Sequence, residues 1–481
     1  MSDFLGSINS FLEAVLFFDI FFGTIEGAKV PFLVAWLISG GIYLTFLTKF
    51  INLRMFKHAF NIIRGRYRTA EDVGEISPFG ALTTALSATV GLGNIAGVAL
   101  AVSLGGPGAT FWMIVAGFLG MSLKFTEVTL SLQHRVFLQD GSVMGGAMEY
   151  LSRGLAQKGY VKFGKVLALI FALFMISGAI GGGNIFQVSQ SLGAVSQEVP
   201  FFKDFPIIFG FIVTLFVGFV IIGGVTRIAK ITEFLVPIMA IIYISASLWI
   251  LAYHFEKLDD AIAIIFHEAF STSALYGGVA GAIVQGFQRA VFSSEAGIGS
   301  SPVAHAPVKT KYAVRQGIVA LYEPFIDTVV ICTMTALVIV ITGVYAHDGA
   351  YAALIEAKQG AALTSAAFGT VVSWFPVILS LSITLFAFST IIAWSYYGER
   401  AWVYLFGSKY SMLYKVGYLA LILLATVTDT AVLVDLSFML FLMMALPNIL
   451  GLFLLGGDVK CQLESYVAKL KSGALDKEAL R

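Results

Sequence analysis

Long apolar stretches follow one another through most of this chain, and they decide what it can fold into. About 20 apolar residues in a helix cross the roughly 30 Å hydrocarbon core of a bilayer. Hydrophobic residues make up 58% of the chain and charged residues only 12%, a composition typical of membrane proteins. The stretches are continuously apolar and do not alternate, so they predict helices and argue against a transmembrane β-barrel.

An all-α polytopic membrane protein with eleven transmembrane helices is therefore predicted. The helices are expected at about residues 30–50, 78–104, 108–131, 163–190, 206–223, 231–253, 273–297, 314–343, 367–396, 412–427 and 430–455. The connecting loops are too short to hold a soluble catalytic or nucleotide-binding domain. Whatever this protein does is expected to happen within the membrane.

Several function classes are excluded by what the sequence lacks. It has no Walker-type glycine loop, which argues against an ATP-driven pump. The histidines, among them His134, His267 and His305, have neither metal-ligand spacing nor a nucleophile beside them, so we expect no enzyme and no organic cofactor. The formal charge of +1 gives no reason to expect nucleic acid as a partner, and no obligatory protein partner is evident.

The positive-inside rule gives an orientation. Lys and Arg residues gather in alternate loops, and acidic residues such as Glu256, Asp259 and Asp260 gather in the loops between them, on the other side of the membrane. We therefore predict an external N-terminus and a cytoplasmic C-terminus in a bacterial-type cytoplasmic (inner) membrane. The loops on the predicted inner side hold most of the 30 Lys and Arg residues, between Arg54 and Arg68, Arg135 and Lys165, Arg227 and Lys230, Lys309 and Arg315, Arg400 and Lys415, and Lys460 and Arg481.

Two predicted helices contain glycine clusters that interrupt a helical path. One contains Ser87-Ala88-Thr89-Val90-Gly91-Leu92-Gly93-Asn94, and the other contains Phe292-Ser293-Ser294-Glu295-Ala296-Gly297-Ile298-Gly299-Ser300. Backbone groups released within a membrane cost several kcal/mol each unless protein, ion or substrate pairs with them, so an unwound stretch marks a cavity. Released amides suit a carboxylate, and released carbonyls suit a cation.

The two breaks also predict the organisation of the chain. Each opens a group of five helices, and because five is odd, the two groups lie in opposite orientations, as in the inverted repeats of secondary transporters. The alternative is that the glycines only permit close helix packing. The predicted parts are an extracellular segment at 1–27, a peripheral helix at 28–51, repeats at 78–254 and 271–455, and a cytoplasmic tail at 456–481.

From about Pro78 to Leu455 the sequence resembles the alanine or glycine:cation symporters, also called sodium:alanine symporters. The resemblance lies in the seventh-helix stretch quoted above and in three further runs. Thr110, Ile114, Ala290 and Ser294 differ from the usual family pattern. The three runs are Gly105-Gly106-Pro107-Gly108-Ala109-Thr110-Phe111-Trp112-Met113, Gly181-Gly182-Gly183-Asn184-Ile185-Phe186-Gln187 and Glu323-Pro324-Phe325-Ile326-Asp327-Thr328.

The resemblance implies a leucine-transporter-type fold and Na⁺-coupled uptake of alanine or glycine by alternating access. We expect the substrate carboxylate at the amides of Gly91, Leu92 and Gly93, near Asn94. Its ammonium group is expected at carbonyls near Thr89 and Phe287. Further residues expected at this site are Gln187, Thr390 and Trp394, with Asn184 facing either the same cavity or an interhelical hydrogen bond.

The co-transported Na⁺ is expected to bind hard oxygen atoms. As in the second sodium site of the related fold, these would be carbonyls near Ser87 and Val90 and the hydroxyls of Ser389 and Thr390. Asn94 is a candidate for another cation site.

Charged residues within the predicted helices are expected to face protein or water. Lys124 and Glu127, three residues apart, predict an ion pair, and Arg289 and Glu295 predict a gate or an ion pair. Open alternatives are uptake of glutamine or another neutral amino acid with H⁺ coupling, an amino-acid-selective channel, and an exporter.

Overall fold

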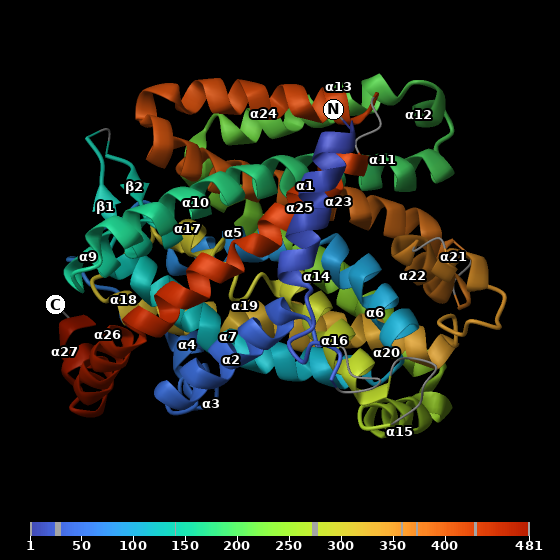
Figure 1. Cartoon of the computed structure of the whole chain (residues 1–481), viewed down its shortest axis with the longest axis horizontal. Helices are drawn as coiled ribbons and strands as arrows, with labels where there is room; N and C mark the ends of the chain where they lie inside the picture. Colours follow the sequence, from blue (N-terminus) through green and yellow to red (C-terminus); the bar gives the residue numbers. More distant parts are fainter. Residues whose placement is uncertain are drawn as a thin grey trace.

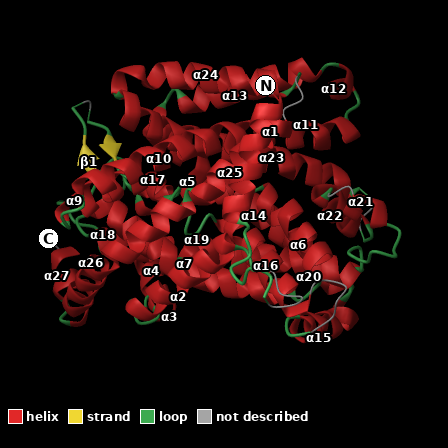
Figure 2. Cartoon of the chain, viewed as in Figure 1, coloured by secondary structure: helices red, strands yellow, loops and turns green. Residues whose placement is uncertain are grey.

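The computed structural model describes residues 2–24, 30–139, 141–271, 278–356, 359–371, 374–427 and 431–479. Helices make up most of this part of the chain (Figure 2). Local sequence signals explain where some of them begin and end. Ser77 caps the helix that begins at Pro78 by accepting a hydrogen bond from the Gly80 amide, and proline suits the first helical position.

The first half of the chain forms a run of helices whose order is seen in Figure 1. They are α1 (Ser2–Leu16), α2 (Phe32–Leu47), α3 (Ile51–Arg54), α4 (Phe56–Ile63), α5 (Pro78–Thr89), α6 (Val98–Gly105), α7 (Ala109–Gln133), α8 (Ala147–Glu149), α9 (Leu155–Gln157), α10 (Val161–Ile180), α11 (Phe186–Glu198), α12 (Phe201–Asp204), α13 (Pro206–Ile221) and α14 (Gly224–Tyr253). A short antiparallel hairpin, β1 (Val136–Phe137) and β2 (Val143–Met144), pairs Val136 with Met144.

The second half continues in the same way. Its helices are α15 (Leu258–Glu268), α16 (Gly278–Ser294), α17 (Pro302–His305), α18 (Ala313–Ala320), α19 (Tyr322–Pro324), α20 (Thr333–Thr342), α21 (Ala352–Glu356), α22 (Gly360–Gly369), α23 (Phe375–Phe406), α24 (Ser411–Ala425), α25 (Ala431–Met443), α26 (Ala445–Lys471) and α27 (Ala474–Ala479). Short 3₁₀ turns lie at Phe255–Lys257 and Ser408–Tyr410, and π-helical turns lie at Gly93–Gly97, Tyr150–Gly154, Gly181–Ile185 and Phe325–Cys332.

Helices from both halves meet at the centre. α7 packs against α16 and α18, α5 packs against α14 and α23, and α23 also packs against α10 and α11. The N-terminal helix α1 packs on α25, with Leu12 and Leu16 buried. The hairpin, α9 and α27 lie at one end of the molecule, and α12, α15 and α21 lie at the other (Figure 1).

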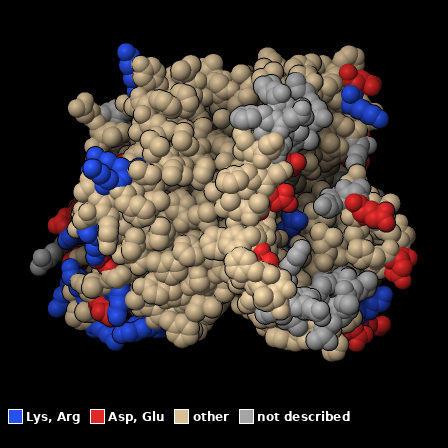
Figure 3. All heavy atoms as spheres, viewed as in Figure 1, with Lys and Arg blue, Asp and Glu red and all other residues tan. Residues whose placement is uncertain are grey.

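The charged residues follow the same division. Most of the Lys and Arg atoms visible in Figure 3 lie toward the end with α9 and α27, and most of the Asp and Glu atoms lie toward the opposite end. The broad tan surface between the ends is largely free of charge, as expected for a surface that faces lipid. Which end faces the cytoplasm stays a prediction.

By length and apolar composition, six helical segments in the described residues could cross a membrane, or seven if one bent pair counts as a span. The predicted count of eleven is therefore not confirmed. α22 ends at Gly369 and α23 begins at Phe375, so the predicted span at 367–396 begins too early and also ends before the helix does. The predicted starts at 28, 273 and 430 lie outside the described residues.

Candidate functional site

The first predicted break is present. α5 stops at Thr89, Val90 is extended (φ −73°, ψ 100°), and the chain resumes with the π-helical turn at Gly93 after a bend of 53°. The Gly91 amide bonds Asn94 Oδ1 at 2.7 Å, whereas in an unbroken helix it would bond the Ser87 carbonyl. The break therefore releases the Ser87 carbonyl from its own helix.

That carbonyl faces hydroxyl groups on α23. The Thr390 hydroxyl donates to Ser87 O at 3.2 Å, and the Ser389 hydroxyl lies 3.3 Å from the same oxygen. In return, the Ser87 hydroxyl donates to Ser389 O at 2.6 Å. All three side chains are buried. The structure thus brings together three of the residues proposed for sodium, and Val90 lies beside them at the end of α5.

The second predicted break follows α16. Glu295, Gly297 and Gly299 all have positive φ angles, of 56°, 86° and 85°, so the helix cannot continue. For a glutamate this backbone conformation costs free energy, about 1 to 3 kcal/mol, and it persists only where surrounding contacts fix it. Helical structure returns at Pro302 in α17.

Side chains from distant helices hold this second break in place. Trp394 Nε1 donates to Glu295 Oε1 at 3.1 Å, and the Ser300 hydroxyl donates to the other carboxylate oxygen. Asn448 Nδ2 donates to Gly297 O at 2.9 Å, and Lys124 Nζ donates to the Ser301 hydroxyl at 2.6 Å. The break is therefore fixed by contacts with α7, α23 and α26.

A small cavity of about 50 Å³ lies against the first break. Because one water-sized probe needs about 10–15 Å³, the cavity has room for a few small groups. Its lining residues come from both breaks, from the π-helical turn at Gly181–Ile185, and from α5, α10, α11, α16, α23 and α25. They are Ala88, Thr89, Gly91, Leu92, Gly93, Gly178, Gly182, Gln187, Phe292, Glu295, Thr390, Trp394, Phe438 and Phe441.

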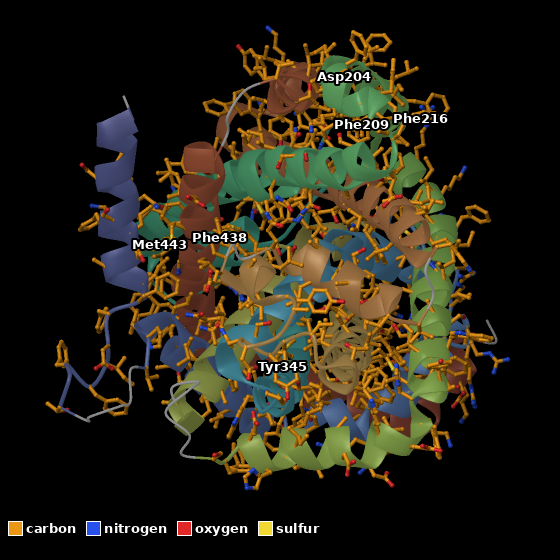
Figure 4. The ribbon with its side chains drawn as sticks, turned by 90° about the vertical axis from the view of Figure 1, so that its right-hand side faces the viewer. Asp204, Phe209, Phe216, Tyr345, Phe438 and Met443 are labelled. Atoms are coloured by element: carbon orange, nitrogen blue, oxygen red, sulfur yellow. The ribbon has the colours of Figure 1, made fainter. Side chains whose placement is uncertain are left out.

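Aromatic rings form much of the wall. The ring centroids of Phe292 and Phe438 are 5.0 Å apart, and those of Trp394 and Phe441 are 5.6 Å apart. Figure 4 shows Phe438 on the side of α25 that faces the helix bundle. Gly183 lets α23 approach closely, since a Cβ atom there would lie 2.4 Å from Trp394 Cβ. These rings limit the volume available to a ligand.

Seven of the nine residues predicted for the substrate line this cavity: Thr89, Gly91, Leu92, Gly93, Gln187, Thr390 and Trp394. In the described part of the chain, Asn94 and Phe287 are not among its lining residues. Asn94 Nδ2 turns to Asp327, donating to Oδ1 at 2.7 Å. Asn184 was expected either to face the cavity or to form an interhelical hydrogen bond. It forms the hydrogen bond, donating to Tyr418 O at 2.8 Å.

Sequence reasoning did not assign several residues to the site. Glu295 and Phe292 lie within the quoted seventh-helix stretch and could have been included on that ground. Phe438 and Phe441 gave no usable signal, because they are two of 42 phenylalanines in an apolar chain. Asp327 also escaped assignment; it is buried, and it accepts hydrogen bonds from Asn94, Ser293 and Thr328.

The predicted Lys124–Glu127 ion pair is wrong. Lys124 Nζ lies 3.2 Å from Glu323 Oε2, and Glu127 accepts instead from Asn448 Nδ2 at 2.6 Å. The spacing put Lys124 and Glu127 on one helix face, but α19 brings another carboxylate to the lysine. Within the described residues Arg289 and Glu295 also form no ion pair, since Glu295 is bound by Trp394 and Ser300.

The site consists of a helix that is interrupted in its middle, with a cavity at the interruption and hydroxyl and carbonyl oxygens beside it. This arrangement defines a class of protein, the secondary transporters. The chain can be aligned with a solved structure of this fold, that of MhsT in complex with L-phenylalanine, with a TM-score of 0.54 and 14% identity over 85% of this chain and 99% of that one. The leucine-transporter-type fold is thereby confirmed.

Residues 17–480 match the sequence model of the sodium:alanine symporter family, and the chain belongs to this family of membrane transporters. It is 38% identical to the sodium/alanine symporter AgcS of Methanococcus maripaludis, over 91% of this chain and 94% of that protein. It is 34% identical to the probable sodium/glutamine symporter GlnT of Bacillus subtilis, over 92% of this chain and 89% of that protein. The resemblance noted in the sequence is confirmed.

Proposed function

We propose that this protein carries a small neutral amino acid, alanine or glycine, into the cell together with Na⁺. One observation carries the proposal: Thr390 lines the small cavity and also donates to the released Ser87 carbonyl. A cation held by Ser87, Val90, Ser389 and Thr390 would therefore touch the wall of the substrate cavity. Such shared contact makes the affinity for each ligand depend on the other.

Each end of a zwitterion has candidate partners around the cavity. The Gly91 amide is bound by Asn94, so the amides of Leu92 and Gly93 are the candidates for the carboxylate. Glu295 and Gln187 are the candidates for the ammonium group, since both line the cavity. Gln187 Oε1 is buried and has no hydrogen-bond partner among the described residues, and an ammonium group would supply a donor.

The size of the cavity favours a small side chain. Trp394, Phe292, Phe438 and Phe441 leave little room beyond the main-chain atoms of an amino acid. Each added methylene must displace one of these rings, and steric exclusion of that kind gives about 10- to 200-fold discrimination. Relatives carry names that refer to alanine and to glutamine, so glutamine is the second candidate substrate.

Coupling to Na⁺ is favoured over coupling to H⁺ because the Ser87–Thr390 cluster consists of neutral oxygen atoms. Hydroxyl and carbonyl oxygens bind Na⁺ and do not take up a proton near neutral pH. One positive charge moving down about 100 mV supplies about 2.3 kcal/mol, which favours uptake over export. We place the protein in the cytoplasmic membrane, with its N-terminus outside.

Uptake of labelled alanine into proteoliposomes tests this proposal. An inward Na⁺ gradient is expected to drive saturable accumulation, with unlabelled glycine competing well and glutamine poorly. A channel would equilibrate alanine without accumulating it. Accumulation that follows a pH gradient and ignores Na⁺ would assign the coupling to H⁺, and strong competition by glutamine would assign that substrate.

A variant pair tests the shared residue. Thr390→Ala is expected to abolish uptake at ordinary Na⁺ concentrations. Thr384→Ala is the matched control, since this hydroxyl is on the same helix and bonds only Ser380 O at 2.9 Å. Equal loss of uptake in both variants would mean that the loss comes from damage to α23, and not from the cation site.

A further inference from the structure

A further cavity, of about 400 Å³, lies where the end of α7, the segment 310–314 that leads into α18, and α26 meet. Figure 1 shows α18 and α26 side by side near α27, at the end of the molecule where most of the visible Lys and Arg atoms gather in Figure 3. None of the described lining residues is acidic, and three are basic: Arg135, Lys311 and Lys469. We call this space the basic cavity.

Arg135 contributes a fixed positive charge to the wall of the basic cavity. Its guanidinium group donates to four main-chain carbonyls, those of Val73, Ala306, Val308 and Thr310, at 2.7 to 3.0 Å. All four acceptors are neutral. They therefore hold the guanidinium group in place without cancelling its charge.

Lys469 brings a second positive charge from α26. Its ammonium group lies 4.8 Å from the centre of the Tyr312 ring and donates to the Tyr312 hydroxyl at 3.1 Å. The third basic residue, Lys311, is different, because it pairs with the carboxylates of Glu71 and Glu478 at 2.7 and 3.7 Å. The excess positive charge of the cavity wall therefore comes from the other two basic residues.

Neutral groups of the wall also suit a phosphate group and a hydroxyl group. The helix α18 begins at Ala313 in this wall, no side chain caps it, and the first amides of a helix carry partial positive charge. The exposed Ser465 adds a hydroxyl. Gln133 Oε1 is buried and has no hydrogen-bond partner among the described residues, so it can accept a bond from a ligand hydroxyl.

We propose that the basic cavity binds the head group of an anionic phospholipid, with the phosphate beside Lys469 and Arg135 and a head-group hydroxyl at Gln133. Basic pockets between transmembrane helices are typical sites for such head groups. This inference goes beyond the proposed function and does not depend on which substrate the protein carries.

The aromatic part of the wall favours a lipid over a soluble anion. The rings of Tyr312 and Tyr466 both line the cavity, and their centroids are 5.8 Å apart. Tyrosine is typical of the interface between membrane and water, where one end of the side chain meets apolar groups and the other meets polar ones. A zwitterionic head group fits less well, because no acidic residue of the described wall would meet its positive charge.

Thermal unfolding of the purified protein in detergent tests this site. Short-chain phosphatidylglycerol is the probe, because it carries a phosphate and free hydroxyl groups. Phosphatidylcholine of the same chain length is the lipid control, and glycerol phosphate is the soluble control. We expect phosphatidylglycerol to raise the midpoint of unfolding saturably, and the two controls to leave it unchanged, because a ligand that binds only the folded state stabilises it.

A pair of lysine variants on one helix tests the residues. Lys469→Gln is expected to weaken the affinity for phosphatidylglycerol about 10-fold, because it removes a charged hydrogen bond. Lys471→Gln is the matched control, since Lys471 is exposed on α26 and does not line the cavity, and it is expected to keep the affinity. Ser465→Phe fills the cavity from an exposed position and is expected to abolish the lipid-dependent rise.

Three results would overturn the proposal. Equal rises with phosphatidylglycerol and phosphatidylcholine, or equal affinities of the two lysine variants, would mean that the basic cavity is not the site. An equal rise with glycerol phosphate would mean that the ligand is a soluble anion. If Lys469→Gln does not fold, Ser465→Phe decides in its place: a lost rise supports the site, and an unchanged rise overturns it.

Discussion

The two breaks look alike in the sequence, yet they are held in opposite ways. At the first break Asn94 binds the Gly91 amide and two hydroxyls on α23 bind the released Ser87 carbonyl, while the glycine-rich stretch itself lines a cavity. At the second break Asn448 binds the released Gly297 carbonyl, and Lys124 binds the Ser301 hydroxyl. The side chains of Ser300 and Trp394 bind Glu295. The first break contributes Gly91, Leu92 and Gly93 to the cavity wall, whereas among the described residues the second break contributes only Glu295.

This difference suggests that the two breaks have different roles. In the proposed function, the first break offers main-chain groups to the substrate and the cation. The second offers one side chain, Glu295, held at a strained backbone position by its neighbours. Damage to the first break should therefore act mainly on ligand binding, and damage to the second should act mainly on folding.

The largest effect is expected from Lys124→Gln. Lys124 and Glu323 are fully buried, so loss of the lysine leaves the Glu323 carboxylate with His305 as its partner but without a permanent counter-charge, and should cost about 3–5 kcal/mol of stability. Thermal unfolding in detergent measures the loss. Lys49→Gln is the matched control, because the Lys49–Glu464 pair is exposed, and it should cost at most about 1 kcal/mol. Equal stability of the two variants would contradict the claim that buried contacts of Lys124 stabilise the second break.

A smaller effect on stability but a larger one on transport is expected from Asn94→Ala. The variant removes the bonds to the Gly91 amide and to Asp327, which should cost about 1–3 kcal/mol and abolish alanine uptake. Asn448→Ala removes a comparable set of bonds at the second break, to Gly297 O, Glu127 and the Tyr150 hydroxyl. It should lose similar stability while the folded fraction keeps its KM. If Asn94→Ala still transports alanine normally while Asn448→Ala changes KM, the proposed difference between the two breaks is wrong.

The smallest effect is expected from Trp394→Phe. This variant keeps an aromatic wall but loses the Nε1–H bond to Glu295, worth about 1 to 2 kcal/mol. Freed from that bond, Glu295 is expected to move, raising KM for alanine a few-fold and admitting larger side chains. Competition by serine and valine in the uptake assay measures the change. Unchanged selectivity would show that Trp394 does not set the cavity size.

Much of this organisation could be predicted from the sequence, because membrane helices follow from composition and the breaks follow from glycine. The run Val90-Gly91-Leu92-Gly93 led directly to the cavity. Phe438 and Phe441 could not be found in this way, since only the packing of α25 against α16 brings them to the site. The strain at Glu295 was also hidden, because a positive φ angle at glutamate has no sequence signature.

The pairing of residues within buried ionic clusters also could not be predicted from the sequence. Lys124 lies three residues from Glu127 on one helix, and the local spacing favoured that pair. In the folded chain Glu323 Oε2 lies 3.2 Å from Lys124 and 2.6 Å separates Glu323 Oε1 from His305 Nε2, so the lysine belongs to a cluster built from three separate segments. Such contacts depend on tertiary packing, which residue spacing within one helix cannot predict.

A cryo-EM structure determined with alanine and Na⁺ tests the central claim most directly. We predict density for the amino acid in the small cavity, with its carboxylate at the Leu92 and Gly93 amides, and a cation touching Ser87 O and the Thr390 hydroxyl. A continuous helix through residues 87–94, or a ligand that lies away from this bend, would contradict the account.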